Sequence, residues 1–137
     1  LSGQEFEYCC CIFATAPFIK KGWLLKAYEH MLAHNFDAVF PLVPYPVPIQ
    51  QAFKFVEESG KTEMFFNNQA GIMTQDYFPS YYDAGQFYWM KTDRVIAKNR
   101  VDGENSGAIL LSEIDCHDID SEDDWKIAEY KYDFLNK

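Results

Sequence analysis

The chain has 137 residues, of which 48% are hydrophobic and 18% aromatic, and this composition predicts one globular domain covering residues 1–137. Its net charge of −9 argues against binding to nucleic acid or to an anionic membrane surface, because both would repel it. No apolar run reaches the roughly 18 residues that span a bilayer and no signal peptide is recognisable, so we expect a soluble, cytoplasmic protein.

The first predicted element is a strand from Tyr8 to Ala14, whose continuous apolar run is typical of a strand buried on both faces. Such a strand lies inside a sheet, so we expect the chain to be part of a longer protein whose other strands flank it. The run Cys9-Cys10-Cys11 has no second cysteine cluster as a partner, and we interpret all four cysteines as reduced, small apolar side chains.

A helix is predicted from about Lys20 to His34, opened by the proline at position 17. We expect its apolar face to pack on the core, and this face consists of Leu24, Tyr28, Met31 and Leu32. His30 and His34 are one helical turn apart and would form half of a zinc site, but no third ligand has a suitable spacing.

Residues 36–40 favour a strand, and the prolines at 41, 44, 46 and 48 then predict an irregular segment that is excluded from a central strand. An antiparallel hairpin is predicted from Ala52–Val56 and Thr62–Phe66, with Gly60 in its turn. Further on we expect one strand at 82–90, a short helix from about residue 92 and a short buried strand at 108–111. This order predicts an α/β domain with a mostly parallel sheet and an inserted antiparallel hairpin.

Two acids stand immediately before the last predicted helix. If the chain is still extended there, Asp118 and Asp120 point the same way while Ile119 points into the core, and two such carboxylates suit a hard divalent cation. Ser121 is the expected helix N-cap, with Asp124 at the third helical position. An apolar stripe, Trp125, Ala128, Tyr132 and Leu135, predicts that this helix packs on a core. The alternative is that the two acids only decorate a capped turn.

Three segments together resemble the cytidylyltransferases that activate nine-carbon acidic sugars, most closely those that act on pseudaminic acid. They are Cys10–Phe18, Gln75–Trp89 and Asp118–Trp125. The resemblance implies a doubly wound, three-layer nucleotidyltransferase-type fold. The glycine- and arginine-rich nucleotide loop of that family lies near its N-terminus and is absent from this chain, so the resemblance covers the C-terminal part of such an enzyme.

The resemblance implies that Asp118 and Asp120 bind the Mg²⁺ that engages the triphosphate of CTP. The implied reaction transfers CMP to the anomeric hydroxyl of the sugar and releases pyrophosphate. Sugar-binding candidates stand after the first strand and along the 75–88 stretch, and they are Thr15, Gln75, Asp76, Asp83, Gln86 and Tyr88. For Gln86 and Tyr88, which share a face of an extended strand, simple packing in the core is the alternative.

Two positions bear on the sugar. Phe13 and the Ala-Gly-Gln at 84–86 resemble the pseudaminic branch rather than the sialic branch, whereas residues 72–74 lack the arginine that the family often has before the Gln-Asp pair.

Relatives in the family are commonly homodimers, and the hairpin at 52–66 is the expected dimer arm. We expect little activity from the 137 residues alone. The alternative function is a non-catalytic interaction or dimerisation domain.

Overall fold

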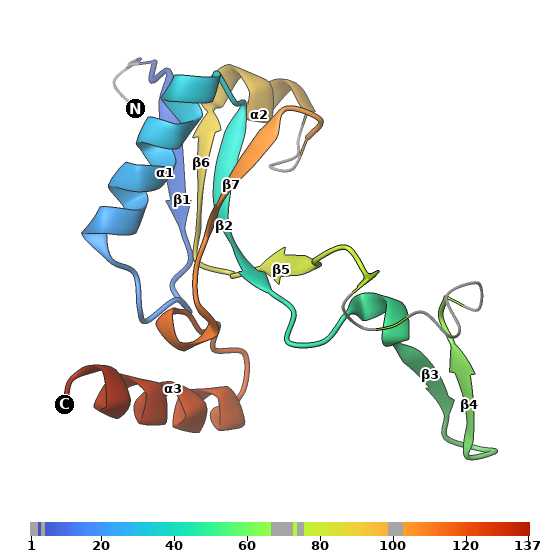
Figure 1. The fold of residues 1–137 in the computed structure, drawn as a ribbon. Helices are drawn as coiled ribbons and strands as arrows, with labels where there is room; N and C mark the ends of the chain where they lie inside the picture. Colours follow the sequence, from blue (N-terminus) through green and yellow to red (C-terminus); the bar gives the residue numbers. More distant parts are fainter. Residues whose placement is uncertain (1–2, 4, 67–72, 74–75, 99–102) are drawn as a thin grey trace. The chain divides into compact units, whose positions relative to one another are not determined.

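The structure is a computed structural model that describes residues 3, 5–66, 73, 76–98 and 103–137. It divides into two compact units, Leu1–Val43 with Asp83–Lys137, and Pro44–Tyr82 (Figure 1). Within the described residues no helix is long and apolar enough to cross a membrane.

Most of the first unit is built on a mixed sheet in the order β1-β6-β2-β5, with β7 also pairing with β2, and the boundary between the units falls within β5. These strands are β1 Tyr8–Ile12, β2 Ala38–Pro44, β5 Tyr81–Asp83, β6 Phe87–Lys91 and β7 Ser106–Leu110. β6 runs antiparallel to both β1 and β2, whereas β7 runs parallel to its neighbour β2. The chain is α/β as predicted, but the prediction of a mostly parallel sheet is wrong. The reason is that β6 begins opposite the end of β1, where the chain returns from the second unit, so it has to run backwards through the sheet.

The prolines did not exclude a central strand. Pro41 is fully buried within β2, opposite Ile109 of β7. Pairing of β2 with β6 ends at Val39, and the Pro41 carbonyl accepts a hydrogen bond from the Ala84 N–H at 3.1 Å. The Pro41 nitrogen therefore faces the edge of β2 where pairing with β6 has already ended. Because no β6 residue is paired there, the lack of an N–H on Pro41 costs no hydrogen bond between these strands.

The predicted strand at 82–90 is two strands, β5 and β6, separated by a turn. Gly85 lies in this turn with φ of +60°, a conformation that glycine adopts without steric cost. The Asp83 carboxylate accepts a hydrogen bond from the Gly85 N–H at 2.9 Å, which closes the turn.

Helix α1, Lys21–His34, packs against β6 and β7 and confirms the predicted helix (Figure 1). Its buried residues are Ala27 and Met31, while Leu32, predicted on the buried face, is 46% exposed. Leu32 stands at the end of the helix, where the chain turns away through Asn35 in the left-handed conformation. Helix α2, Thr92–Lys98, follows β6 as predicted.

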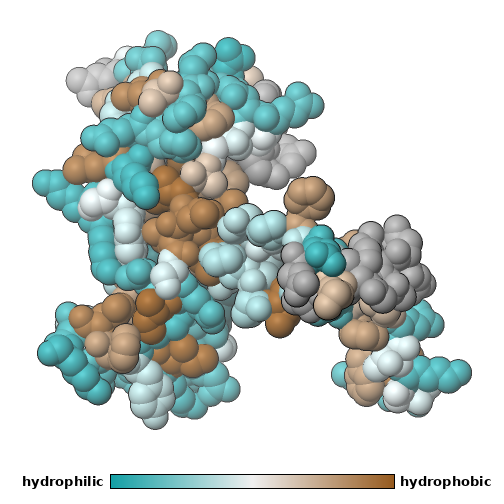
Figure 2. All heavy atoms as spheres, in the orientation of Figure 1, coloured by the Kyte–Doolittle hydropathy of each residue, from teal (hydrophilic) through white to brown (hydrophobic). Residues whose placement is uncertain are grey.

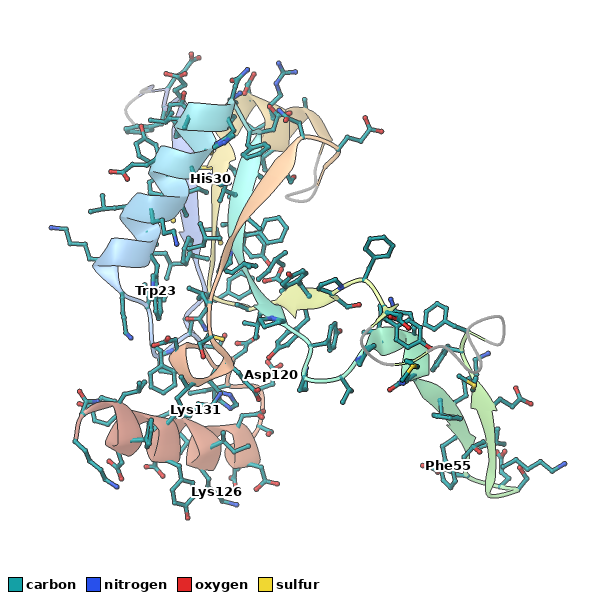
Figure 3. All side chains as sticks on the ribbon, viewed as in Figure 1. Trp23, His30, Phe55, Asp120, Lys126 and Lys131 are labelled. Carbon is teal, nitrogen blue, oxygen red and sulfur yellow. The ribbon has the colours of Figure 1, made fainter. Side chains whose placement is uncertain are left out.

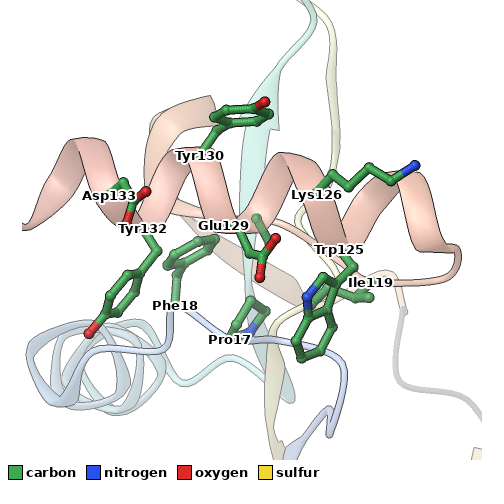
Figure 4. A pocket seen from close by; sticks show the side chains of 10 residues that line it. Pro17, Phe18, Ile119, Trp125, Lys126, Glu129, Tyr130, Tyr132 and Asp133 are labelled. Carbon is green, nitrogen blue, oxygen red and sulfur yellow. The ribbon is translucent and has the colours of Figure 1, made fainter.

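Helix α3, Glu122–Leu135, ends the chain and is preceded by the short 3-10 helix η4, Glu113–Asp115. Only Ala128 of α3 is buried, and Trp125 and Tyr132, expected in the core, are 58% and 59% exposed. Apolar side chains are visible on the α3 part of the surface in Figure 2. Three residues of the stripe, Trp125, Ala128 and Tyr132, line a groove of about 590 Å³ that is also lined by Pro17 and Phe18 (Figure 4).

The second unit contains the 3-10 helix η1, Ile49–Gln51, and the predicted hairpin. The hairpin consists of β3, Phe53–Val56, and β4, Lys61–Met64, and Gly60 takes a positive φ of +66° in its turn. The unit is closed near its ends by a hydrogen bond from the Tyr45 N–H to the Ser80 carbonyl at 2.9 Å.

Candidate functional site

Asp118 lies on the segment between η4 and α3, directly against the Gly85 turn. A side chain at Gly85 would place its Cβ only 2.7 Å from Asp118 Oδ2. The other oxygen, Asp118 Oδ1, is buried and has no hydrogen-bond partner among the described residues. A buried carboxylate oxygen without a partner is costly, and a cation or a hydrogen-bond donor on a ligand would satisfy it.

The backbone of the acidic motif is tied to the loop that follows β1. The Ile119 N–H donates a hydrogen bond to the Thr15 carbonyl at 3.1 Å. This bond brings the Thr15 loop beside the predicted metal ligands. Asp120 is exposed next to it, and Figure 3 labels it at the start of α3.

The N-terminus of α3 is capped as predicted. Ser121 Oγ accepts a hydrogen bond from the Asp124 N–H at 3.2 Å and donates one to Asp124 Oδ2 at 2.6 Å. The hydrogen bond from Ser121 holds the pKa of Asp124 below its usual value. Asp124 Oδ2 also accepts from the Asp120 N–H at 3.3 Å, so this oxygen is engaged by the cap.

Tyr88 and Asp83 form a hydrogen-bonded pair on the two strands that flank the Gly85 turn. The Tyr88 hydroxyl donates to Asp83 Oδ2, and the Tyr88 ring lies 5.4 Å from those of Phe13 and Phe40. Burial, assisted by the hydrogen bond to Asp83, raises the pKa of Tyr88 far above its usual value. The negative charge of Asp118 contributes to the same shift, which places Asp118 in the electrostatic surroundings of Tyr88.

Gln86 is fully buried, which agrees with the alternative that it packs in the core rather than on a surface offered to a sugar. Its amide nitrogen donates to the His117 carbonyl at 3.1 Å and to the Ala84 carbonyl at 3.4 Å. Gln86 therefore connects the Gly85 turn to the residue before Asp118. Its contact with a sugar stays a prediction.

Two predicted site residues belong to other parts of the sequence. Gln75 falls outside the described residues. Asp76 belongs to the second unit, where it is exposed and its N–H donates to the Met73 carbonyl at 2.9 Å. The predicted site residues that lie in the first unit and are exposed or half-buried are therefore Thr15, Asp83, Tyr88, Asp118 and Asp120.

Within the described part of the chain, no group of three or more His, Cys, Asp or Glu side chains could hold a metal ion. Two carboxylates are nevertheless a usual protein contribution to a Mg²⁺ site, because phosphate oxygens and water complete the octahedral shell. The buried, unpartnered oxygen of Asp118 fits such an ion.

Sequence analysis missed Lys131, a residue of α3 whose ammonium group reaches the segment before Asp118. It donates to the Glu113 carbonyl at 2.7 Å and to the Cys116 carbonyl at 2.9 Å. The only signal in the sequence is its spacing of seven residues from Asp124, which puts both on one face of the helix.

No protein-family model matches the chain. Two proteins named pseudaminic acid cytidylyltransferase, from Campylobacter jejuni strains 81-176 and NCTC 11168, are each 29% identical to it over 129 residues. A Helicobacter pylori protein named pseudaminic acid cytidylyltransferase and UDP-2,4-diacetamido-2,4,6-trideoxy-beta-L-altropyranose hydrolase is 27% identical over 117 residues, which are 85% of this chain and 22% of that protein. The Campylobacter jejuni matches cover 94% of this chain but 55% of each relative, so the chain spans about half the length of these relatives. The similarity confirms the resemblance drawn from the three sequence segments.

Proposed function

We propose that this chain is the sugar- and metal-binding part of a cytidylyltransferase that transfers CMP from CTP to a nine-carbon acidic sugar, with pseudaminic acid the favoured substrate. The observation that carries the proposal is the Asp118 carboxylate, whose buried oxygen has no hydrogen-bond partner in the described part of a chain that matches the named relatives over 94% of its length. The doubly wound nucleotidyltransferase fold is part of the same proposal.

In the proposed reaction the anomeric hydroxyl oxygen of the sugar attacks the α-phosphorus of CTP. A bond forms between that oxygen and phosphorus, the bond from the α-phosphorus to the bridging oxygen breaks, and pyrophosphate leaves as the hydroxyl proton is released. Asp118 and Asp120 would hold Mg²⁺, which when bound supplies positive charge to the triphosphate and to the leaving pyrophosphate.

The other residues of the site have tasks that follow from their contacts. Because its pKa is raised, Tyr88 stays protonated at neutral pH and acts as a hydrogen-bonding group rather than as a base. Asp83 holds the Tyr88 hydroxyl and the Gly85 turn, and its exposed position leaves it open to a sugar hydroxyl or amide. The Phe13 ring beside Tyr88 offers an apolar contact to the sugar's acyl groups.

A homodimer is the second part of the proposal, and the hairpin of the second unit supports it. Phe53 and Phe55 lie on one face of β3 and are 58% and 64% exposed, whereas Lys54 and Glu63 form a cross-strand pair on the other face. Figure 3 labels Phe55 on this hairpin. A two-stranded hairpin with an exposed apolar face is marginal in water, and burial against a second copy would stabilise it.

The same apolar face is the observation that favours the alternative function, a non-catalytic interaction or dimerisation domain. The two functions differ in whether the acidic motif has a chemical task. We expect the 137 residues alone to have little turnover, because an acidic chain does not by itself neutralise CTP.

The experiment is a pyrophosphate-release assay with CTP, Mg²⁺ and either pseudaminic or sialic acid, on the longest native form of the protein. Asp118→Asn and Asp120→Asn test the metal ligands, and Asp123→Asn is the matched control, because it removes an equal charge from an exposed position whose ion pair is with Lys126. We expect turnover with pseudaminic acid that is lost in the first two variants and kept in the third. No turnover with either sugar would refute the enzymatic function and favour the interaction domain.

A further inference from the structure

The segment that carries Asp118 and Asp120 is fixed at both ends by one face of helix α3. At its far end, Asp124 caps the helix with Ser121 and accepts the Asp120 N–H at 3.3 Å. At its near end, Lys131 donates to the carbonyls of Glu113 and Cys116 at 2.7 and 2.9 Å. Asp124 and Lys131 are two helical turns apart, so they project from the same side of α3.

The ring of His117 lies between these two side chains. Its Nδ1 is 3.5 Å from Lys131 Nζ, and its Nε2 is 3.8 Å from Asp124 Oδ1. The His117 side chain is only 16% exposed, and its backbone carbonyl is held by Gln86 at 3.1 Å. The residue immediately before Asp118 is therefore restrained from α3 and from the Gly85 turn at once.

Lys131 serves the end of η4 in a specific way. The last carbonyl groups of a helical turn have no partner within the helix, and a lysine side chain satisfies them well. Here the lysine comes from another helix, so one ammonium group caps the C-terminal end of η4 and links it to α3. Figure 3 labels Lys131 on the side of α3 that faces η4, and Lys126 on the opposite side.

We propose that Lys131 is a positioning residue for the metal site: by holding the Glu113 and Cys116 carbonyls it fixes the backbone from which the Asp118 and Asp120 carboxylates project. The hydrogen bonds of Lys131 reach the Glu113 and Cys116 carbonyls and the His117 ring rather than the carboxylates themselves. The inference rests on the proposed function for the identity of the ligand, a divalent cation. Groups that orient metal ligands usually affect metal affinity by about 10- to 100-fold.

The test compares Lys131→Met with Lys126→Met in the metal-free, full 137-residue chain. Both variants lose one positive charge from α3, but Lys126 forms its ion pair with Asp123 of the same helix. Backbone hydrogen exchange is followed at Ile119, whose N–H is bonded to Thr15, and at Leu111, whose N–H is bonded to Leu42 and reports on the sheet. We expect about tenfold faster exchange at Ile119 in Lys131→Met, with Leu111 unchanged and Lys126→Met like the parent chain.

The second readout is Mn²⁺ affinity, measured from the loss of the electron paramagnetic resonance signal of free Mn²⁺. We expect about tenfold weaker binding in Lys131→Met and partial recovery in Lys131→Arg, which keeps hydrogen-bond donors. The inference is overturned if exchange at Ile119 does not change, if Leu111 accelerates equally, or if exchange rises while Mn²⁺ affinity stays the same. If the parent chain binds no Mn²⁺, the proposed metal site itself is refuted, and exchange at Ile119 still decides whether Lys131 holds the segment.

Discussion

Replacing Gly85 with alanine should harm the metal site more than the fold. The φ of +60° makes any side chain there strained, at a cost of about 1–2 kcal/mol, partly offset by about 0.5 kcal/mol from the lower entropy of the unfolded chain. The new methyl group would also lie 2.7 Å from Asp118 Oδ2, well inside the ordinary contact distance of 3.4 Å. The carboxylate therefore has to move by about 0.7 Å, more than the roughly 0.5 Å that a binding site tolerates.

We expect Gly85→Ala to lower the free energy of unfolding by about 1 kcal/mol in urea, and to weaken Mn²⁺ binding by about tenfold or more. Gly60→Ala is the matched control, because Gly60 has a φ of +66° but no atom within 4 Å of an added Cβ. It carries the backbone strain without the contact, so its Mn²⁺ affinity should equal that of the parent chain. Equal Mn²⁺ affinity in both variants would refute the contact between Gly85 and Asp118 as the reason for glycine.

Three further changes have defined outcomes. Gly107→Ala should cost about 1–3 kcal/mol in urea unfolding, since its Cβ would lie 2.4 Å from the Phe36 ring, and Phe36→Leu should recover part of the loss. Ser121→Ala should cost about 1 kcal/mol at pH 7 by removing the helix cap. Because Ser121 lowers the pKa of Asp124, this part of the stability should be complete above about pH 4 and be lost as the pH falls through the lowered folded-state pKa. Phe55→Ser should convert a dimer to a monomer in sedimentation velocity.

Each of these predictions would be contradicted by a specific result. Additive effects of Gly107→Ala and Phe36→Leu would show that the two residues do not compete for one space. If the stability difference between Ser121→Ala and the parent chain persists unchanged to pH 2, the Asp124 carboxylate does not contribute to the stabilising effect of the cap. Lys61→Ser, on the charged side of the hairpin, should leave the dimer intact, and its dissociation would mean that the apolar face is not the contact.

Local chemistry was enough to predict the parts of the fold that depend on neighbours in the chain. Ser121 and Asp124 are three residues apart, and their hydrogen bonds confirm the cap predicted from that spacing. Gly60 was likewise predicted in a turn between two β-prone runs, and it lies there with a positive φ. These features need no knowledge of the rest of the molecule.

The errors arise where a residue's fate depends on partners far away in the sequence. Pro41 was excluded from a central strand because it has no backbone N–H. Whether that matters depends on whether the neighbouring strand pairs at this position, and the pairing of β2 with β6 ends at Val39. The parallel sheet was inferred from element order, which does not reveal that β6 returns from the second unit antiparallel to β1 and β2.

The candidate site was predictable to a similar extent. Asp118 and Asp120 were chosen as candidate metal ligands because two acids precede a capped helix, a pattern visible in eight residues; the cap is confirmed and the metal binding stays a prediction. The burial of Gln86 agrees with the alternative of packing in the core, but its partner, the His117 carbonyl, was not predictable because it is 31 residues away. Lys131 was missed for the same reason, since its bonds reach back 15 and 18 residues to carbonyl groups that have no signature in a sequence.

The hydrogen bond from Tyr45 to Ser80 has a consequence for how this molecule can be remodelled. It joins the chain where it enters the second unit to the chain where it leaves, so the two ends of the segment 45–80 already meet. The entropy cost of closing such a loop grows only with the logarithm of its length, by about 0.6 kcal/mol for each doubling. The second unit is therefore an exchangeable module: it can be trimmed, enlarged or replaced by a tight turn at little thermodynamic cost to the scaffold that holds Asp118.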